Sequence, residues 1–463
     1  MADVNVAQAA HEQAEVFFTN RRLSRGERAD RGARMRLEVP LSSHAQVPQM
    51  SQRRDPVEIL RGQEVTREAA LVPLRYERMS ASPFAFLRGA AAVMASDLSM
   101  VPRTTLRTQL CGDAHLSNFG MFASVDRRLV FDLNDFDETL PGPFEWDVKR
   151  LAASVAVAGA ALEISRKDAH RAARAAVGAY RETMIRLAQL STLEVWFARL
   201  DVDSLIDEAG KSELAKATRQ ARKKSRTRTS DTTAGKLTEA GPNGRQFRTE
   251  EPVLVRVPEE RREEVIARLT ALYTEYLGTL PPDRTALLMR YSFVDVAHKV
   301  VGVGSVGTRA LVLLLESGDG EPLLLQIKQA GESVLAPYLG ASRFDQGGQR
   351  VVLGQQSMQA TGDPFLGWAR GQDRDYFVRQ LKDMKGSIEP DLLSAKSLRQ
   401  YARLCGAVLA RAHARTGDAS TIAGYLGEED TFERAVADFA MAYTAITVAD
   451  HDALVTSLAA AAG

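Results

Sequence analysis

Cysteine is almost absent from this sequence of 463 residues, which contains only Cys111 and Cys405. Two cysteines cannot build a disulfide framework, so we expect a reducing compartment, the cytoplasm, and stability that comes from an apolar core. The N-terminus has no basic stretch followed by an apolar one, and we therefore expect no signal peptide.

Long apolar runs and an excess of charge of one sign are absent too. The longest apolar run, Leu151–Ile164, is too short to cross a bilayer and predicts a buried helix, so we expect no membrane partner. Lysine plus arginine (60) nearly cancels aspartate plus glutamate (59), which gives no general affinity for polyanions. The basic run Arg222–Arg228 lacks interleaved aromatic residues, so it indicates a solvated face and no nucleic-acid partner.

Composition divides the chain into four stretches. Residues 1–54 are rich in Arg, Ser and Pro and predict an extended or partly disordered arm. Residues 55–290 are mainly helical, with a basic and turn-rich insertion at about 205–250. Residues 291–385 are strand-like, and residues 386–463 are helical again. The sequence thus predicts an α+β protein.

Hydrophobic periodicity predicts the individual elements. Apolar residues three and four positions apart predict helices over Ser82–Leu98, from Asp147 to about Leu190, from about Glu259 to Leu277, and over Gln346–Ala360. Strand-like runs begin at Tyr291 and continue through LLLQIKQA, and two more follow in DPFLGWA and DYFVRQL.

Two acidic segments lie close together in the front part of the chain. The first, CGDAHLSNFG, contains Asp113 and Asn118, and the second is FDLNDFDE. Phosphoryl transfer requires one carboxylate that accepts the proton of the attacking hydroxyl, and an amide and a carboxylate that hold Mg²⁺ against the phosphates. We therefore predict Asp113 as the catalytic base and Asn118 as a metal ligand. The alternative is that these residues only form turns and cap helices.

Three aspartates compete for the second place on the metal. Asp132 follows the strand-like run Leu129–Phe131, and we prefer it as the ligand because it ends the strand. Asp135 and Asp137 are its rivals. His115, in the first acidic segment, either orients the catalytic base or the substrate, or it bonds to the loop backbone.

A glycine-rich turn and a lysine follow in the second half of the chain. The turn GVGSVG contains Gly302, Gly304, Ser305 and Gly307, and it lies between two strand-like runs rather than before a helix. This arrangement predicts a flap whose backbone N–H groups approach nucleotide phosphates. Lys328, on the next strand, would then hold the α/β-phosphates of ATP. The alternative is an ordinary hairpin with a surface lysine.

Both acidic segments resemble a known family. GDAHLSN resembles the G-D-x-H-x-x-N catalytic loop of aminoglycoside phosphotransferases and other small-molecule kinases of the protein-kinase-like fold. FDLNDFDETLPGPFEWDVKRLA resembles their metal-binding segment and the helix after it, which begins near Asp147. Here, however, the catalytic loop precedes the glycine turn and Lys328. The resemblance therefore implies a two-lobe kinase-like fold in circularly permuted order, which is tolerable when native termini can be joined.

The same resemblance implies ATP and Mg²⁺ as cofactors and a hydroxyl-bearing small molecule as substrate. RQLKDMKGS falls where a kinase hinge would be, so Gln380, Leu381 and Lys382 are expected at the adenine. From about Asp55 onward, motifs such as RMSASPFAFLRG and NDFDETLPGPFEWD make the chain resemble the bacterial domain of unknown function 2252 family. That family name implies no activity.

Two other functions stay open on the sequence. One is a nucleotide-binding regulatory protein without turnover, because Gln346–Ala360 contains no glutamate to pair with Lys328. The other is a metal-dependent phosphoesterase with Asp113, His115 and Asp132 as ligands, although the glycine turn then has no role.

Overall fold

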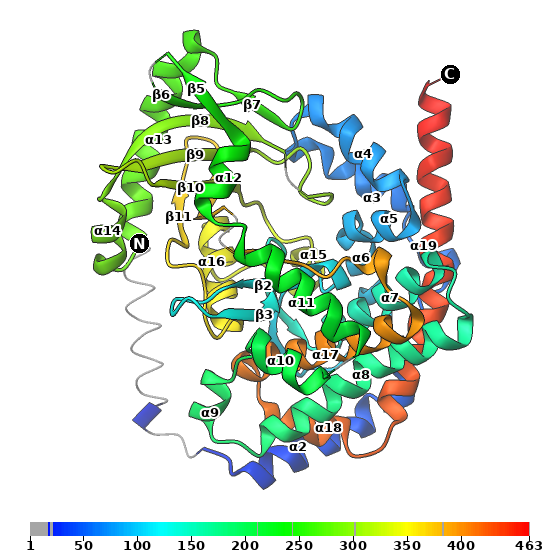
Figure 1. Ribbon diagram of the computed structural model, residues 1–463. Coiled ribbons are helices and arrows are strands. Elements are labelled where there is room, and N and C mark those ends of the chain that lie inside the picture. Colours follow the sequence, from blue (N-terminus) through cyan, green and yellow to red (C-terminus); the bar gives the residue numbers. More distant parts are fainter. Residues whose placement is uncertain are drawn as a thin grey trace.

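The protein is described here by a computed structural model that covers residues 17–18 and 22–462, except 211, 243, 301, 382 and 383. The chain is a mixed α+β protein in which helices predominate and half of the described strands lie in one six-stranded sheet (Figure 1). Among the described residues, no helix combines the length and the apolar character needed to pass through a membrane.

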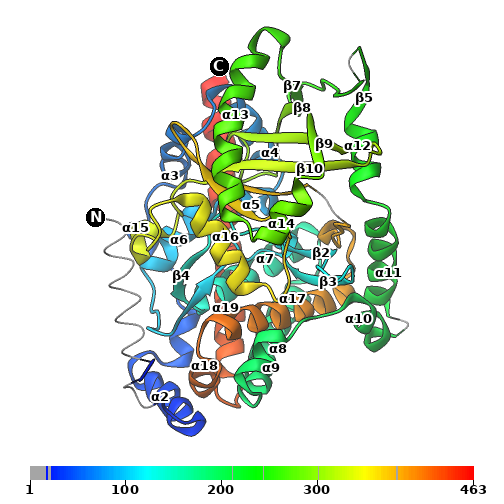
Figure 2. The same cartoon turned by 90° about the vertical axis from the view of Figure 1, so that its left-hand side faces the viewer.

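The six-stranded sheet is antiparallel, with the order β11-β12-β10-β9-β8-β7. Its strands are β7 (Leu254–Arg256), β8 (Tyr291–Lys299), β9 (Ala310–Ser317), β10 (Pro322–Gln329), β11 (Gly367–Arg370) and β12 (Asp375–Gln380). Helix α13 (Glu259–Thr279) covers one face, and α12 (Ser230–Leu237) packs on the other (Figure 2). A sheet covered on both faces needs apolar residues at successive positions, which explains the unbroken leucine runs of β9 and β10.

The strands predicted after residue 291 are confirmed, but the predicted boundary at that residue is corrected. Strand β7 and helix α13 precede it and belong to the same unit as the sheet. Leu269, Leu272 and Tyr276 of α13 are buried with the apolar side chains of β9, β10 and β12. The unit therefore begins near Leu254, because its covering helix comes before most of its strands in the chain.

The larger part of the molecule is helical and encloses its own apolar core. It is built mainly from α7 (Glu145–Ala161), α8 (Arg166–Ala188), α17 (Ala395–Thr416), α18 (Ala419–Leu426) and α19 (Thr431–Ala462). Helices α8 and α17 approach so closely that a Cβ at Gly406 would lie 2.0 Å from the carbonyl oxygen of Ala176. The alanine-rich stretch predicted as helical is therefore confirmed as α7 and α8, whose small residues permit close packing.

Two short hairpins position the acidic segments. Strand β1 (Arg107–Leu110) pairs with β4 (Leu140–Pro143), and β2 (Phe119–Ala123) pairs with β3 (Leu129–Leu133). The first acidic segment connects β1 to β2, and the second connects β3 to β4. Because the two outer strands pair with each other and the two inner strands do the same, both connecting loops emerge at one place.

The N-terminal segment is folded from residue 22 onward, which corrects the extended arm predicted for residues 1–54. Helix α2 (Arg25–Glu38) begins with a capping box formed by Ser24 and Glu27. It packs on α18, where Arg28 forms an ion pair with Asp418 at 2.9 Å. The arginine-rich composition of α2 indicated disorder because the sequence alone does not reveal that α18, far away in the chain, packs against it. Residues 1–16 and 19–21 of the predicted arm lie outside the described residues.

Two further predictions change in detail. The single helix predicted over Ser82–Leu98 is two helices, α5 (Pro83–Gly89) and α6 (Ala91–Ser99), separated at Ala90. The basic insertion contains helix α11 (Glu213–Arg226), helix α12 and a hairpin of β5 (Thr238–Gly241) and β6 (Gly244–Phe247). The remaining helices are α3 (Pro56–Gly62), α4 (Val72–Ser80), α9 (Thr192–Phe197), α10 (Val202–Ala209), α14 (Pro282–Leu288), α15 (Ala336–Leu339) and α16 (Gly347–Met358).

Candidate functional site

Helix α7 holds the first acidic segment in place. The Asp147 carboxylate accepts hydrogen bonds from the backbone N–H groups of Cys111 (2.8 Å) and Gly112 (3.1 Å). Gly112 has a φ of +82°, and a Cβ there would lie 2.4 Å from the carbonyl oxygen of Glu138. Glycine is required because the two acidic loops cross at this point with no room for a side chain.

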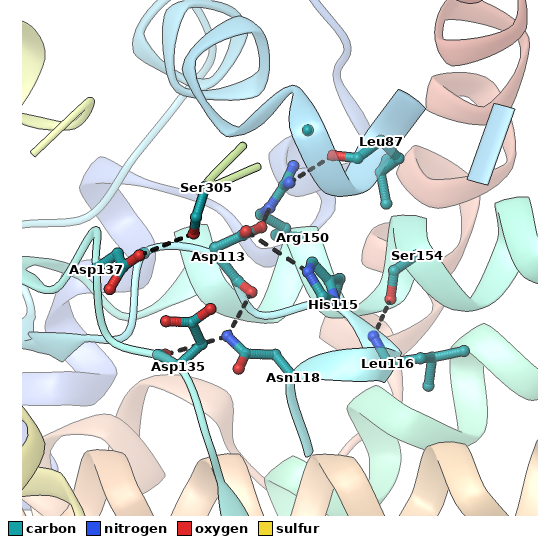
Figure 3. A network of polar contacts seen from close by, with 12 residues as sticks. Leu87, Asp113, His115, Leu116, Asn118, Asp135, Asp137, Arg150, Ser154 and Ser305 are labelled. Carbon is teal, nitrogen blue, oxygen red and sulfur yellow. Dashed lines mark hydrogen bonds and ion pairs between the residues drawn. The ribbon is translucent and has the colours of Figure 1, made fainter. Parts of the chain in front are cut away.

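Asp113 is held by an arginine that lies one helical turn after Asp147. The Arg150 Nε donates to Asp113 Oδ1 at 2.6 Å, and another nitrogen of the same guanidinium donates to the Leu87 carbonyl oxygen at 2.7 Å (Figure 3). The Asp113 side chain remains 22% exposed, whereas that of Arg150 is 3% exposed. The carboxylate is therefore oriented from behind and still accessible from the cavity described below.

His115 and Asn118 lie on either side of this carboxylate. His115 Nε2 is 3.5 Å from Asp113 Oδ2, and burial lowers the pKa of His115 to about 4, so the ring is neutral at neutral pH. Asn118 Nδ2 donates to the carbonyl oxygens of Asp113 (3.0 Å) and Asp135 (3.1 Å) and so ties the two loops together (Figure 3). Its Oδ1 is buried without a hydrogen-bond partner among the described residues. That oxygen is free to bind a cation.

Asp132 lies in the core, not in the cavity that holds Asp113. Its side chain is 4% exposed, and Arg411 of α17 donates a hydrogen bond to Asp132 Oδ1 at 2.5 Å. Burial raises the pKa of Asp132, and the attraction of Arg411 opposes that shift. The strand continues to Leu133, so Asp132 does not end it. The structure therefore gives no support to the preference for Asp132 as metal ligand.

Asp135, unlike Asp132, lies in the wall of the cavity that holds Asp113. Its side chain is 47% exposed toward the cavity, while its Oδ1 is buried without a hydrogen-bond partner. Burial alone would raise the pKa of Asp135, but Lys328, Arg379 and His115 outweigh it and hold that pKa at about 2. An ionised carboxylate beside the Asn118 amide oxygen is the kind of pair that Mg²⁺ binds together with phosphates and water.

Lys328 reaches the second acidic loop from strand β10. Its Nζ forms an ion pair with Asp137 and lies 3.9 Å from Asp135 Oδ1, although Asp137 is 191 positions away in sequence. Ser305 of the glycine turn donates a hydrogen bond to Asp137 Oδ2 at 3.1 Å. The Lys328 side chain is 2% exposed, so the alternative of a surface lysine is wrong. Burial and the nearby Asp135 raise the pKa of Asp137.

Helix α16 contains no glutamate to pair with Lys328, but its Arg350 supports the second acidic loop. Arg350 donates to the backbone carbonyl oxygens of Asp137 (2.7 Å), Thr139 (2.7 Å) and Gly331 (2.9 Å). The sequence predicted this helix and its lack of a glutamate, but it did not identify Asp137 as the partner of Lys328. For Arg150 a signal existed, because its spacing of three from Asp147 places both side chains on one helix face.

The glycine turn is held by helix α4 and the residues just before it. Arg78 donates to the Gly302 carbonyl oxygen (2.6 Å), and the backbone N–H of Glu68 donates to the Gly307 carbonyl oxygen (2.7 Å). Gly302 and Gly307 have φ values of +70° and +88°. A Cβ at Gly304 would lie 3.2 Å from a carbonyl oxygen of α5. Three glycines therefore allow a tight turn against the preceding helices.

Residues of both acidic loops and of the glycine turn line one cavity of about 630 Å³. The predicted residues found in its wall are Asp113, His115, Asn118, Asp135, Gly302, Gly304 and Ser305. Arg67, Arg88 and Arg379, which the sequence had not indicated, line it as well, and so does Lys385, at the end of the predicted hinge segment. Among the described residues, no three His, Cys, Asp or Glu side chains are grouped to hold a metal by themselves.

The predicted hinge residues are only partly in reach of this cavity. Gln380 lines a neighbouring cavity of about 660 Å³, which shares Arg379 and Lys385 with the first. The backbone N–H of Gln380 donates to Asp363 (2.5 Å), and that of Leu381 donates to Leu324 (2.9 Å). These two N–H groups are therefore not free for an adenine. Lys382 lies outside the described residues.

The fold and the site define a mixed α+β protein in which a buried lysine meets an acidic loop beside an Asp–His–Asn segment. Residues 67–457 match the model of a family described as uncharacterized proteins conserved in bacteria, DUF2252. The chain belongs to this family, as its motifs indicated. None of the curated proteins and none of the solved structures matches the chain.

Proposed function

We propose that this protein is an ATP- and Mg²⁺-dependent phosphotransferase that acts on a hydroxyl group of a small molecule. A kinase-like two-lobe fold in circularly permuted order is part of the same proposal, with the six-stranded sheet as the nucleotide-covering lobe. The observation that carries it is the contact of Lys328 with Asp135 and Asp137 in the cavity that also contains Asp113. A lysine, a glycine turn and an acid–amide pair at one place are the parts that phosphoryl transfer uses.

Each side chain has a role in this proposal. Asp113 accepts the proton of the attacking hydroxyl, and Arg150 keeps its carboxylate in position. Asn118 and Asp135 would hold Mg²⁺, which neutralises charge on the phosphates when it is bound. Their unpartnered buried oxygens fit this role. Lys328 exchanges part of its attraction to the acidic loop for the phosphates of ATP.

One observation favours the regulatory alternative. The Asp113 carboxylate is paired with Arg150 at 2.6 Å, so one of its two oxygens is already engaged. A protein that binds nucleotide without turnover would keep such a pair at no cost to its function. The phosphoesterase alternative is not favoured. Asp113 and His115 lie in the cavity wall, whereas Asp132 lies outside it and is bound to Arg411.

Calorimetric titration with Mg·ATP, followed by an ADP-release assay with hydroxyl compounds, tests the proposal. Wild type should bind Mg·ATP, and Lys328→Met should weaken binding about tenfold or more, since it removes a charged contact to phosphate. Asp113→Asn should retain Mg·ATP binding and lower turnover by about 10²–10⁴. Absence of binding at millimolar Mg·ATP would sink both the kinase and the regulatory function. Binding without turnover, identical in wild type and Asp113→Asn, would establish the regulatory one.

A further inference from the structure

Two cations in the cavity wall, Arg88 and Lys385, make no side-chain hydrogen bond or ion pair with a residue that the structure describes. Arg88, near the end of α5, makes no hydrogen bond or ion pair with any residue that the structure describes, and its Nε is buried. Arg379, in the same wall, is engaged, since its Nε donates to Gln326 at 2.9 Å. Arg88 is half-buried, and a buried Nε without a hydrogen bond is costly, so an anionic ligand in the cavity would complete its bonding.

A second arginine lies in the same wall. Arg67 donates to the Val306 carbonyl oxygen at 2.5 Å, but its Nε is also buried without a partner. Burial lowers the pKa of Arg67 and of Arg88, and nearby carboxylates oppose the shift in both. For Arg88 the first of these is Asp113, the proposed base. Arg67 and Arg88 line the same cavity as Asp113, which would accept the proton of the acceptor hydroxyl.

We propose, on the basis of the function proposed above, that the acceptor carries an anionic oxygen group, a phosphate or a carboxylate, which Arg88 binds with help from Arg67. A guanidinium matches such groups because its planar fork donates two parallel hydrogen bonds. The same arginine repels ammonium groups. The site therefore selects hydroxy acids or phosphorylated polyols, and it rejects the polycationic aminoglycosides that its catalytic-loop motif would otherwise suggest.

Binding and turnover with compounds of different charge test this inference. In the presence of saturating Mg·ADP, calorimetry measures inorganic phosphate and glycerate, with glycerol as the neutral probe and kanamycin as the cationic one. The ADP-release assay then compares glucose 6-phosphate and glycerate with glycerol and kanamycin. We expect binding and turnover with the anions only. A preference for phosphate or for glycerate identifies which anionic group the site takes.

Variants of Arg88 locate the effect. Arg88→Gln should weaken binding of the anions by about tenfold to a hundredfold, the range for loss of a charged hydrogen-bond donor, and leave the Kd of Mg·ATP unchanged. Arg88→Lys keeps the charge without the fork and should lie between wild type and Arg88→Gln. Arg61→Gln is the matched control, since Arg61 is exposed, bonds to Ser457 and lies outside the cavity wall.

Three outcomes overturn the inference. Equal binding of glycerol or kanamycin removes the selection by charge, and unchanged anion binding in Arg88→Gln removes the role of Arg88. Weaker Mg·ATP binding in Arg88→Gln assigns this arginine to the phosphates of the nucleotide. If Mg·ATP does not bind but phosphate binds in an Arg88-dependent way, the proposed kinase function fails while the anion site stands.

Discussion

Asp132 and Asp135 are three residues apart and have opposite surroundings. Asp132 is enclosed in the core with Arg411, an arginine 279 positions away in sequence. Asp135 follows the end of the same strand and faces the cavity with Lys328 close by. The comparison shows that an acidic run has no single role, because its carboxylates are divided between a buried ion pair that holds the fold together and a site that can bind ligands.

The cationic partners of Asp132 and of the cavity acids also differ. Arg411 is an arginine, which stays charged at any pH that a folded protein survives. The cavity acids Asp135 and Asp137 instead share Lys328, and Lys385 lies in the same cavity wall. Burial together with the neighbouring Arg379 lowers the pKa of Lys385 to about 7. The core ion pair is thus constant, and the cavity is adjustable.

The largest expected difference between the two acids is in stability. Asp132→Asn leaves Arg411 buried without its counter-charge and should lower the free energy of unfolding by about 3–5 kcal/mol. Asp135→Asn should change it by less than about 1 kcal/mol, because its side chain is half exposed and Lys328 keeps Asp137. Urea unfolding of both variants measures the difference. Equal losses would mean that the two carboxylates do not have separate roles.

For Mg·ATP binding, we expect the larger loss in the Asp135 variant and the smaller one in the Asp132 variant, the reverse of the order for stability. Asp135→Asn removes a negative charge from the proposed Mg²⁺ site and should weaken Mg·ATP binding by about tenfold to a hundredfold. Asp132→Asn, measured at low temperature and low denaturant where it is still folded, should bind like wild type. Calorimetry with and without Mg²⁺ gives both values. Stronger loss in Asp132→Asn would restore the ligand that the sequence favoured.

The smallest expected effect concerns pH. A lysine whose pKa falls from 10.5 to about 7 on folding opposes the fold most below pH 7, and this cost disappears as the pH rises toward 10. Wild type should therefore gain about 1 kcal/mol of stability from pH 7 to 10 through Lys385, after allowance for solvent screening. Lys385→Met should lack that gain. Thermal unfolding across this pH range, with Lys396→Met at an exposed position as the control, shows whether the gain belongs to Lys385.

Much of the architecture was predictable from the sequence because it depends on local patterns. Strands β8 to β12 and helices α13, α16 and α17 follow from apolar periodicity. The basic N-terminal segment was misjudged because α2 depends on α18, which lies at the other end of the chain. The start of the sheet unit was misplaced because α13 covers strands that come after it.

The sequence by itself determined which residue types the site contains. Asp113, Asn118 and the acidic loop follow from their spacing, and Lys328 follows from its place on the second strand after the glycine turn. Only the tertiary structure decided how they combine. Asp132 is excluded by an arginine from α17, and Lys328 is paired with Asp137 rather than with a glutamate of α16. The physical reason is that the residue type alone fixes the charge of a side chain, whereas packing between segments that are distant in the chain decides which opposite charge lies beside it.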